Sequence, residues 1–258
     1  MREALKGFST YGGEPEGDLR LLGSVLDWGD LELPSGAAPQ SLMAIRDAAA
    51  KLFSQGARPI CLGGAHTVTQ GVLAGLAASK PMQQVALLIL DAHLDEREEE
   101  DSSTITRGAP FSSTLRSGFA RGSQTAVVGL RPFANSRMFT EWMRESGVHL
   151  IMVDDVARWG AEHAAQVVLE RVAPDGRPLY LSIDLDVVDP AYAPGTGHAC
   201  PGGLSSREII TFLSTLLRRA ELAGADIVEL APPLDIGERT SKLAARLLLE
   251  ILASFTRG

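Results

Sequence analysis

The sequence predicts an α/β fold in three layers, with helices on both faces of a mainly parallel sheet. Short β-branched runs alternate with longer helical segments, and several runs are apolar throughout, as is typical of strands covered on both faces. The expected strands are Pro59–Leu62, Val85–Leu90, Thr125–Leu130, His149–Val153, Leu179–Ile183 and Ile227–Leu230. The expected helices are Pro39–Ser54, Thr67–Ala78, Ser136–Ser146, Glu162–Val172, Ser206–Ala223 and Ser241–Phe255.

Signals at the helix ends support these elements. Ser205, with Glu208 three residues later, predicts a capping box that opens the fifth helix. Gly56, Gly147 and Gly224 stand where helix C-caps belong. Because the chain shows neither an internal repeat nor a long linker, we expect residues 1–258 to form a single domain.

The composition excludes several classes of protein. A net charge of -8 provides no basic face for nucleic acid or for an anionic membrane surface. Two isolated cysteines, Cys61 and Cys200, indicate neither a disulfide framework nor a metal knuckle. The N-terminal residues lack the apolar core of a signal peptide, and no run of about 18 apolar residues occurs. We therefore expect a soluble cytoplasmic protein without nucleic-acid or membrane partners.

Three clusters of acidic and histidine residues follow expected strands, at the sheet edge where parallel sheets bind ligands. They are GGAHT at 63–67, DAHLD at 91–95 and SIDLD at 182–186. In an extended segment, residues two apart point to the same face. Asp91 can therefore converge with His93, and Asp184 with Asp186.

So many carboxylates at one sheet edge repel each other, and burial disfavours their charged forms. Two divalent cations, held about 3.5–4 Å apart by shared carboxylates, would neutralise them and activate a water molecule. Oxygen and imidazole ligands without thiolate favour manganese, with other divalent transition metals as alternatives. Each cluster alone could be a capped turn or a polar loop. Together, in this order, they predict a dinuclear metal centre.

These clusters, with SIDLDVVDPAYAPGTGHACPGG at 182–203 and VELAPPLD at 228–235, resemble the motifs of the ureohydrolases, the family of arginase, agmatinase and formimidoylglutamase. The resemblance covers roughly Asp27 to the C-terminus, whereas residues 1–26 match the family poorly. It implies the arginase-like fold, a three-layer sandwich around a mainly parallel sheet of about eight strands. It also implies a homo-oligomer, either a trimer or a hexamer.

The resemblance further implies a role for each site residue. One ion would be bound by His66, Asp91, Asp95 and Asp184, and the other by Asp91, His93, Asp184 and Asp186. Glu229 matches the carboxylate that binds the cationic amidine or guanidine group of the substrate. Asp95 would also help to move a proton to the leaving nitrogen.

The sequence departs from the family pattern beside the site. Ala65 replaces a common aspartate, which could loosen His66. Arg107 stands where arginases and agmatinases place a proton-transferring histidine, and arginine stays protonated. His198, after the PGTG turn, could replace that histidine, although a solvated loop histidine is the more common case. Arg97 matches an arginine of formimidoylglutamases; alternatively, Arg97 and Arg107 only offset the acidic run at 95–101.

We therefore predict a dinuclear-manganese hydrolase of carbon–nitrogen bonds in linear amidines. An acidic formimidoyl amino acid such as N-formimidoyl-glutamate is the favoured substrate, because Arg97 and Arg107 would suit a substrate with carboxylates. The alternative is agmatine or a guanidino acid, with release of urea, because AYAPGTG at 191–197 looks more like agmatinases. A further alternative, motivated by Ala65 and Arg107, is a metal-binding protein without activity.

Overall fold

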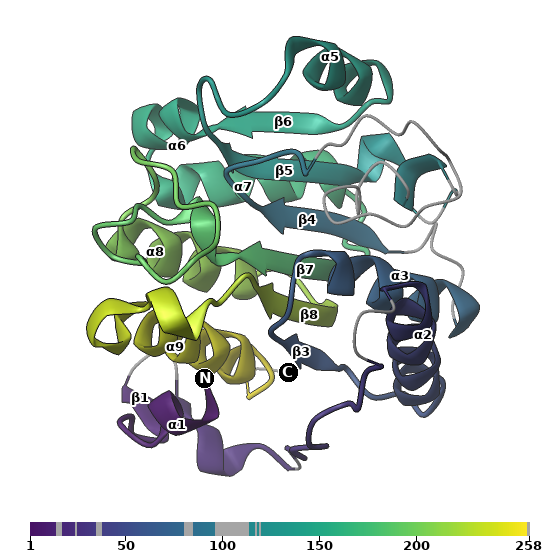
Figure 1. Ribbon diagram of the computed structural model, residues 1–258, viewed down its shortest axis with the longest axis vertical. Coiled ribbons are helices and arrows are strands. Elements are labelled where there is room, and N and C mark those ends of the chain that lie inside the picture. Colours follow the sequence, from purple (N-terminus) through teal and green to yellow (C-terminus); the bar gives the residue numbers. More distant parts are fainter. Residues whose placement is uncertain are drawn as a thin grey trace.

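A computed structural model describes residues 1–13, 17–23, 25–34, 38–79, 85–95, 114–116, 118 and 120–256. Its centre is a parallel sheet of six strands in the order β3-β8-β7-β4-β5-β6 (Figure 1). The strands are β3 (Ile60–Leu62), β4 (Ala86–Leu90), β5 (Thr125–Leu130), β6 (His149–Met152), β7 (Leu179–Asp184) and β8 (Leu222–Val228). All five residues of β4 are buried, as expected of a central strand covered on both faces.

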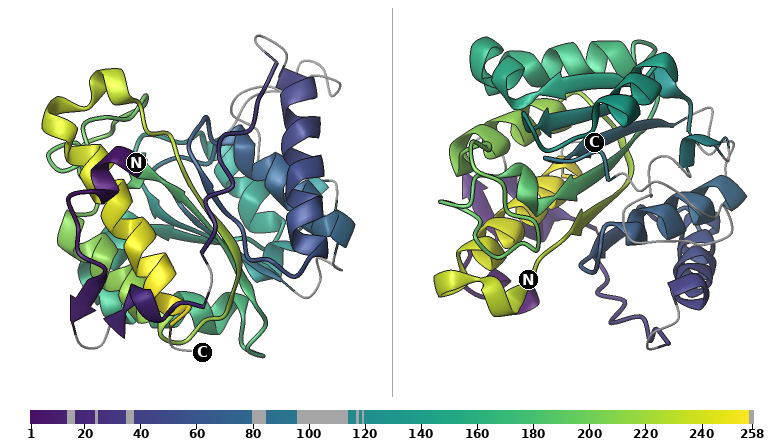
Figure 2. Two further views of the ribbon diagram at one scale, coloured as in Figure 1. Left: turned by 90° about the horizontal axis from the view of Figure 1, so that it is seen from below. Right: turned by 45° about the horizontal axis from the view of Figure 1, so that its top comes forward.

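Helices cover both faces of the sheet (Figure 2). One layer consists of α2 (Ala38–Ser54), α3 (Thr67–Ser79) and α5 (Arg137–Glu145), and its core includes Leu87 and Ile89 of β4. The other consists of α6 (Val153–Trp159), α7 (Ala161–Val172), α8 (Ser206–Leu217) and α9 (Arg239–Ser254), and its core includes Leu88 and Leu90. Successive residues of β4 thus face opposite layers. The predicted three-layer α/β architecture is confirmed.

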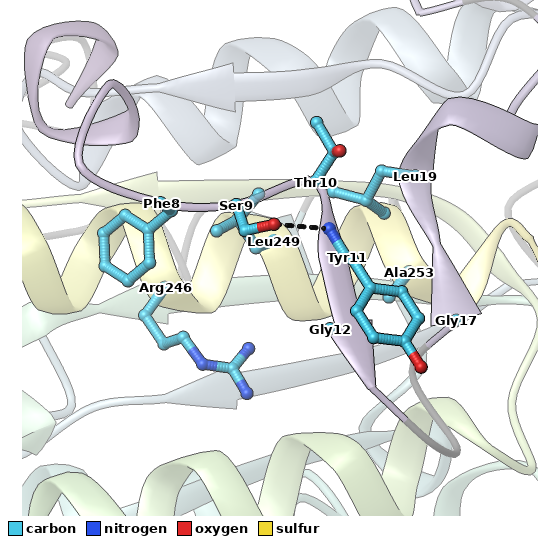
Figure 3. A pocket seen from close by; sticks show the side chains of 10 residues that line it. All are labelled: Phe8, Ser9, Thr10, Tyr11, Gly12, Gly17, Leu19, Arg246, Leu249 and Ala253. Carbon is cyan, nitrogen blue, oxygen red and sulfur yellow. Dashed lines mark hydrogen bonds between the residues drawn. The ribbon is translucent and has the colours of Figure 1, made fainter.

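The N-terminal residues form a small separate structure beside α9. It contains α1 (Arg2–Leu5), the antiparallel pair β1 (Tyr11–Gly13) and β2 (Gly17–Asp18), and the 3-10 turn η1 (Leu19–Leu21). A cavity of about 200 Å³ lies between this structure and α9, lined by residues that include Phe8, Tyr11 and Arg246 (Figure 3). In the described ranges the main sheet therefore has six strands, fewer than the approximately eight expected.

The region around α8 and β8 differs from the sequence-based expectation. The helix predicted over Ser206–Ala223 ends at Leu217, and the strand begins at Leu222 rather than Ile227. Gly224 is a residue of β8, where an added Cβ would lie 3.1 Å from the carbonyl oxygen of Pro59, so its assignment as a helix cap was wrong. The start of β8 lacks β-branched residues, and burial between β3 and β7 overrides that weak local propensity.

The other helix-end predictions agree with the structure. Ser205 and Glu208 form both hydrogen bonds of the capping box that opens α8. Gly56 and Gly147 have φ values of 78° and 85° just after α2 and α5, in the left-handed region expected of a C-cap glycine. Helix α6, however, begins at Val153, where the sequence predicted the end of a strand. Within the described ranges, no helix has the length and apolar character needed to cross a membrane.

Candidate metal centre

The three predicted clusters meet at the carboxyl ends of the sheet strands. His66 lies in the turn between β3 and α3, and Asp91 directly follows β4. Asp184 ends β7, and Asp186 belongs to η4 (Leu185–Val187), the 3-10 turn that follows. Glu229 directly follows β8. The parallel topology therefore brings these side chains to one edge from four strands.

Three carboxylates converge on one ring nitrogen of His66. Its Nδ1 lies 3.1 Å from Oδ2 of Asp91, 3.0 Å from Oδ2 of Asp95 and 3.2 Å from Oδ2 of Asp184. A ring nitrogen carries at most one hydrogen, so Nδ1 cannot donate to all three oxygens. Oδ2 of Asp91 is also buried without a hydrogen-bond partner in the described part of the chain. These four atoms therefore fit the ligands of a cation.

A second group shares Asp91 with the first. Nδ1 of His93 lies 2.9 Å from Oδ2 of Asp186 and 3.7 Å from Oδ1 of Asp91. The two oxygens of Asp91 thus face different groups, as expected of a carboxylate that bridges two ions. Asp184 faces the first group through Oδ2, while its Oδ1 accepts a hydrogen bond from the N–H of Asp186 at 2.8 Å. In each of the triads His66–Asp91–Asp184 and Asp91–His93–Asp186, the potential ligand atoms lie within 4.8 Å of one another.

Burial and the close approach of charged groups shift the pKa values in this cluster. Burial, together with the charges of Asp186 and Asp95, raises the pKa of Asp91 to about 6. Burial also raises the pKa of Asp184 well above its ordinary value, and the neighbouring carboxylates add to this effect. Hydrogen bonding to Asp186 raises the pKa of His93 to about 11. Without a cation the cluster therefore retains protons, which metal ions would displace.

A buried hydrogen-bond chain holds His66 from behind. Nε2 of His66 lies 2.9 Å from Oγ of Ser182, whose hydroxyl donates to Oδ1 of Asp226 at 2.6 Å. The hydroxyl of Tyr180 donates to the other oxygen of Asp226, also at 2.6 Å. With its hydroxyl hydrogen donated to Asp226, Ser182 can accept from Nε2–H. Hydrogen bonds to Asp184, Asp91 and Asp95 raise the pKa of His66, so a cation bound at Nδ1 would have to displace the hydrogen there. Ser182 thus supports His66 despite the alanine at position 65.

Sequence reasoning missed Asp226 and Tyr180. Asp226 lies in β8, in a stretch where the sequence was read as the connection between a helix and a strand. It is fully buried, and its hydrogen-bond partners Tyr180 and Ser182 are far away in the sequence. A single acidic residue within the apolar stretch LAGADIV was the available signal, because such a residue needs a buried partner.

Two of the residues predicted to act in catalysis have a left-handed backbone. Asp95 has a φ of 46° and Glu229 a φ of 62°, values that are uncommon for residues other than glycine. Oε1 of Glu229 accepts a hydrogen bond from the N–H of His66 at 2.7 Å, which ties this carboxylate to the first group. Strained backbone of this kind concentrates at functional sites.

The remaining predicted residues lie outside the two groups of potential ligands or outside the described residues. The exposed ring of His198 lies edge-on to that of His93, with 6.2 Å between the ring centroids. His198 is therefore near the second group but does not belong to either triad. Arg97 and Arg107 lie outside the described residues, so their predicted roles stay predictions.

The profile of the Arginase family matches residues 1–254. This chain belongs to the Arginase family. Members of the Arginase family are hydrolases that act on carbon–nitrogen bonds of amidines or guanidines. Their dinuclear metal chemistry agrees with the two groups of histidine and aspartate residues at the sheet edge.

Relatives within the Arginase family differ in their substrates. The formimidoylglutamase of Halalkalibacterium halodurans is 32% identical to this chain over 98% of the chain and 78% of its own length. The agmatinase of Bacillus subtilis is 30% identical over 100% of the chain and 84% of its own length. The crystal structure of formimidoylglutamase from Bacillus subtilis has a TM-score of 0.91 and 28% identity, covering 99% of this chain and 79% of that one.

Proposed function

We propose that this chain hydrolyses a carbon–nitrogen bond of a linear amidine at a dinuclear manganese centre. The observation that carries the proposal is the convergence of three carboxylates on Nδ1 of His66, beside a second group that shares Asp91. The proposed ligands are His66, Asp91, Asp95 and Asp184 for one ion and Asp91, His93, Asp184 and Asp186 for the other. Oxygen and imidazole ligands without thiolate support manganese.

The bound cations would supply a water molecule with a lowered pKa as the nucleophile. Glu229 would bind and orient the cationic amidine, because paired N–H donors match the oxygens of a carboxylate. Its Oε1 already accepts from the backbone of His66, so the substrate would be held beside the first group. Oε2 of Glu229 faces the PGTG turn, where an added Cβ on Gly197 would lie 3.9 Å away.

Asp95 would move a proton to the leaving nitrogen. Among the three carboxylates around His66 it is the most accessible, with a side chain 22% exposed compared with 0% for Asp91 and 2% for Asp184. A carboxylate that exchanges protons with a substrate has to reach the open side of the site. His198 is exposed beside His93 and is the proposed second proton carrier, in place of the histidine that Arg107 replaces.

The favoured substrate is an acidic formimidoyl amino acid such as N-formimidoyl-glutamate. Arg97 and Arg107 support this choice, since guanidinium groups bind substrate carboxylates in paired hydrogen bonds. The formimidoylglutamase relatives also support it. The agmatinase relatives, at similar identity, support the alternative of a guanidino substrate. We further propose that the protein assembles as a homo-oligomer.

A panel of substrates tests the proposal. The protein is loaded with Mn2+ and incubated with N-formimidoyl-glutamate, agmatine and guanidinobutyrate, with an Asp184→Ala variant as the inactive control. We expect formamide and glutamate from the formimidoyl acid. Urea from agmatine without turnover of the formimidoyl acid would contradict the favoured substrate. A protein that binds two ions per chain but turns over none of these compounds would contradict the proposed hydrolase activity.

A further inference from the structure

The segment between β5 and α5, Arg131–Asn135, contains none of the proposed ligands but contacts both loops that form the second group. We call it the β5–α5 segment. Its first residue, Arg131, is only 1% exposed and is among the largest fully buried side chains. Burying a guanidinium costs free energy unless its N–H groups form hydrogen bonds. The contacts of Arg131 therefore indicate its role in the fold.

Arg131 binds the backbone beside Asp186. One terminal nitrogen donates to the carbonyl of Asp186 at 3.1 Å and to that of Val187 at 2.6 Å. The other donates to the carbonyl of Gly129 in its own strand. In the part of the chain that the structure describes, Nε of Arg131 has no hydrogen-bond partner, so the guanidinium is held through its terminal nitrogens. The side chain therefore fixes the backbone that carries Asp186.

The fold leaves room for this side chain. A Cβ added to Gly203 would lie 2.0 Å from the terminal nitrogen of Arg131, so only glycine is compatible with the guanidinium at this position. A Cβ added to Gly129 would lie 2.3 Å from the side chain of Val187. Gly203 thus leaves space for the guanidinium, and Gly129 allows β5 to approach the Asp186 loop closely.

The same segment also holds the loop that carries Asp91 and His93. The N–H of Arg131 donates to the carbonyl of Ala92 at 3.0 Å. The side-chain amide of Asn135 donates to that carbonyl at 3.2 Å, and its oxygen accepts from the N–H of Leu94 at 2.7 Å. These bonds hold the backbone of Ala92 and Leu94, the residues on either side of His93.

We propose that the β5–α5 segment is a positioning element for the second metal ion, clamping the loop of Asp91 and His93 against the loop of Asp186. This inference rests on the proposed metal binding. It also predicts an asymmetry between the two groups. His66, a proposed ligand of the first ion alone, is held separately through Ser182 and Asp226, so loss of the clamp should weaken the second ion more than the first.

Titration of the full chain with Mn2+ tests the inference, using calorimetry for the two affinities and electron paramagnetic resonance to distinguish a coupled ion pair from a single ion. In Asn135→Ala and Arg131→Met we expect the second ion to bind about tenfold more weakly or worse, with the first ion changed much less. Asn135→Asp keeps the acceptor for the N–H of Leu94, so its affinity for the second ion should fall less than that of Asn135→Ala. Asn135 is half-buried, so its variants should fold even if Arg131→Met does not.

Ser136→Ala is the matched control. Ser136 is the next residue and caps α5 through the N–H of Phe139, so its loss should lower stability without weakening the second ion. Unchanged affinities in Asn135→Ala, equal weakening of both ions, or the same loss in Ser136→Ala would overturn the positioning role while leaving the proposed function intact. A wild-type chain that binds no Mn2+ would overturn both.

Discussion

Oγ of Ser182 lies 2.9 Å from Nε2 of His66, on the side of the ring opposite the three carboxylates. Ser182 passes its own hydrogen to Asp226, so its free lone pair accepts from Nε2–H. This contact fixes the orientation of the ring and keeps a hydrogen on Nε2. The face of His66 that we propose binds metal is thus oriented by residues outside the proposed ligand set.

Ser182→Ala should therefore weaken the first metal ion. We expect its affinity for Mn2+ to fall about tenfold to a hundredfold, because contacts behind a ligand have effects of this size. Calorimetric titration measures the change. Ser214→Ala is the matched control, because the hydroxyl of this half-buried serine donates to the carbonyl of Thr211 within its own helix, α8. Equal affinities in wild type and Ser182→Ala would contradict the assigned role.

Glu229→Gln should reduce catalysis without removing metal. The substitution keeps the size of the side chain but removes the charge that would bind the amidine cation, so we expect kcat/KM to fall about a hundredfold. Steady-state kinetics and metal analysis of the same sample measure both quantities. Glu238→Gln serves as control, since Glu238 is exposed and shares the left-handed backbone, with a φ of 57°. Loss of metal from Glu229→Gln would show that Glu229 supports the ligands instead.

The affinity of the second group for metal should rise with pH. The pKa of His93 is raised to about 11 by its hydrogen bond to Asp186, so the ring is protonated at neutral pH when no metal is bound. Binding must release that proton, and the affinity should rise about tenfold for each pH unit below the raised pKa. Titrations between about pH 6 and pH 8, in buffers of different ionisation enthalpy, count the released protons. An affinity that does not change with pH would show that the metal ion does not compete with a proton on His93.

The metal-free protein should lose stability as the pH rises. The pKa of His93 increases from 6.5 to about 11 on folding, so this group stabilises the fold fully below pH 6.5 and progressively less up to about pH 11. Thermal unfolding of the metal-free chain should accordingly show a Tm that falls across this range. The Mn2+-loaded chain should lack this contribution, because its ring carries no proton to lose. Parallel pH profiles of the two forms would contradict the expectation.

The sequence could predict which groups lie together at the sheet edge, because the spacing of their residues is local. Asp91 with His93, and Asp184 with Asp186, follow single strands two residues apart, and the topology of a parallel sheet brings strand ends together. Parallel pairing of β4 with β7 then aligned the two clusters.

The supporting residues were not predictable in this way, because their contacts join distant segments. Tyr180 and Asp226 meet only through the pairing of β7 with β8, and the sequence placed the start of β8 incorrectly. Arg131 follows an apolar strand without any motif, and the space for its guanidinium depends on Gly203, which is far away in the sequence. The extended strand pattern predicts where a cation could bind, whereas tertiary packing determines what holds its ligands.

The number of metal ions bound by three proteins tests the shared-carboxylate centre most directly. Each protein is saturated with Mn2+, dialysed and measured by elemental analysis. Asp91 faces both groups and Asp186 only the second, so we predict two ions per chain in wild type, one in Asp186→Ala and none in Asp91→Ala. A wild-type chain without bound metal, or an Asp91→Ala variant that keeps both ions, would contradict the account.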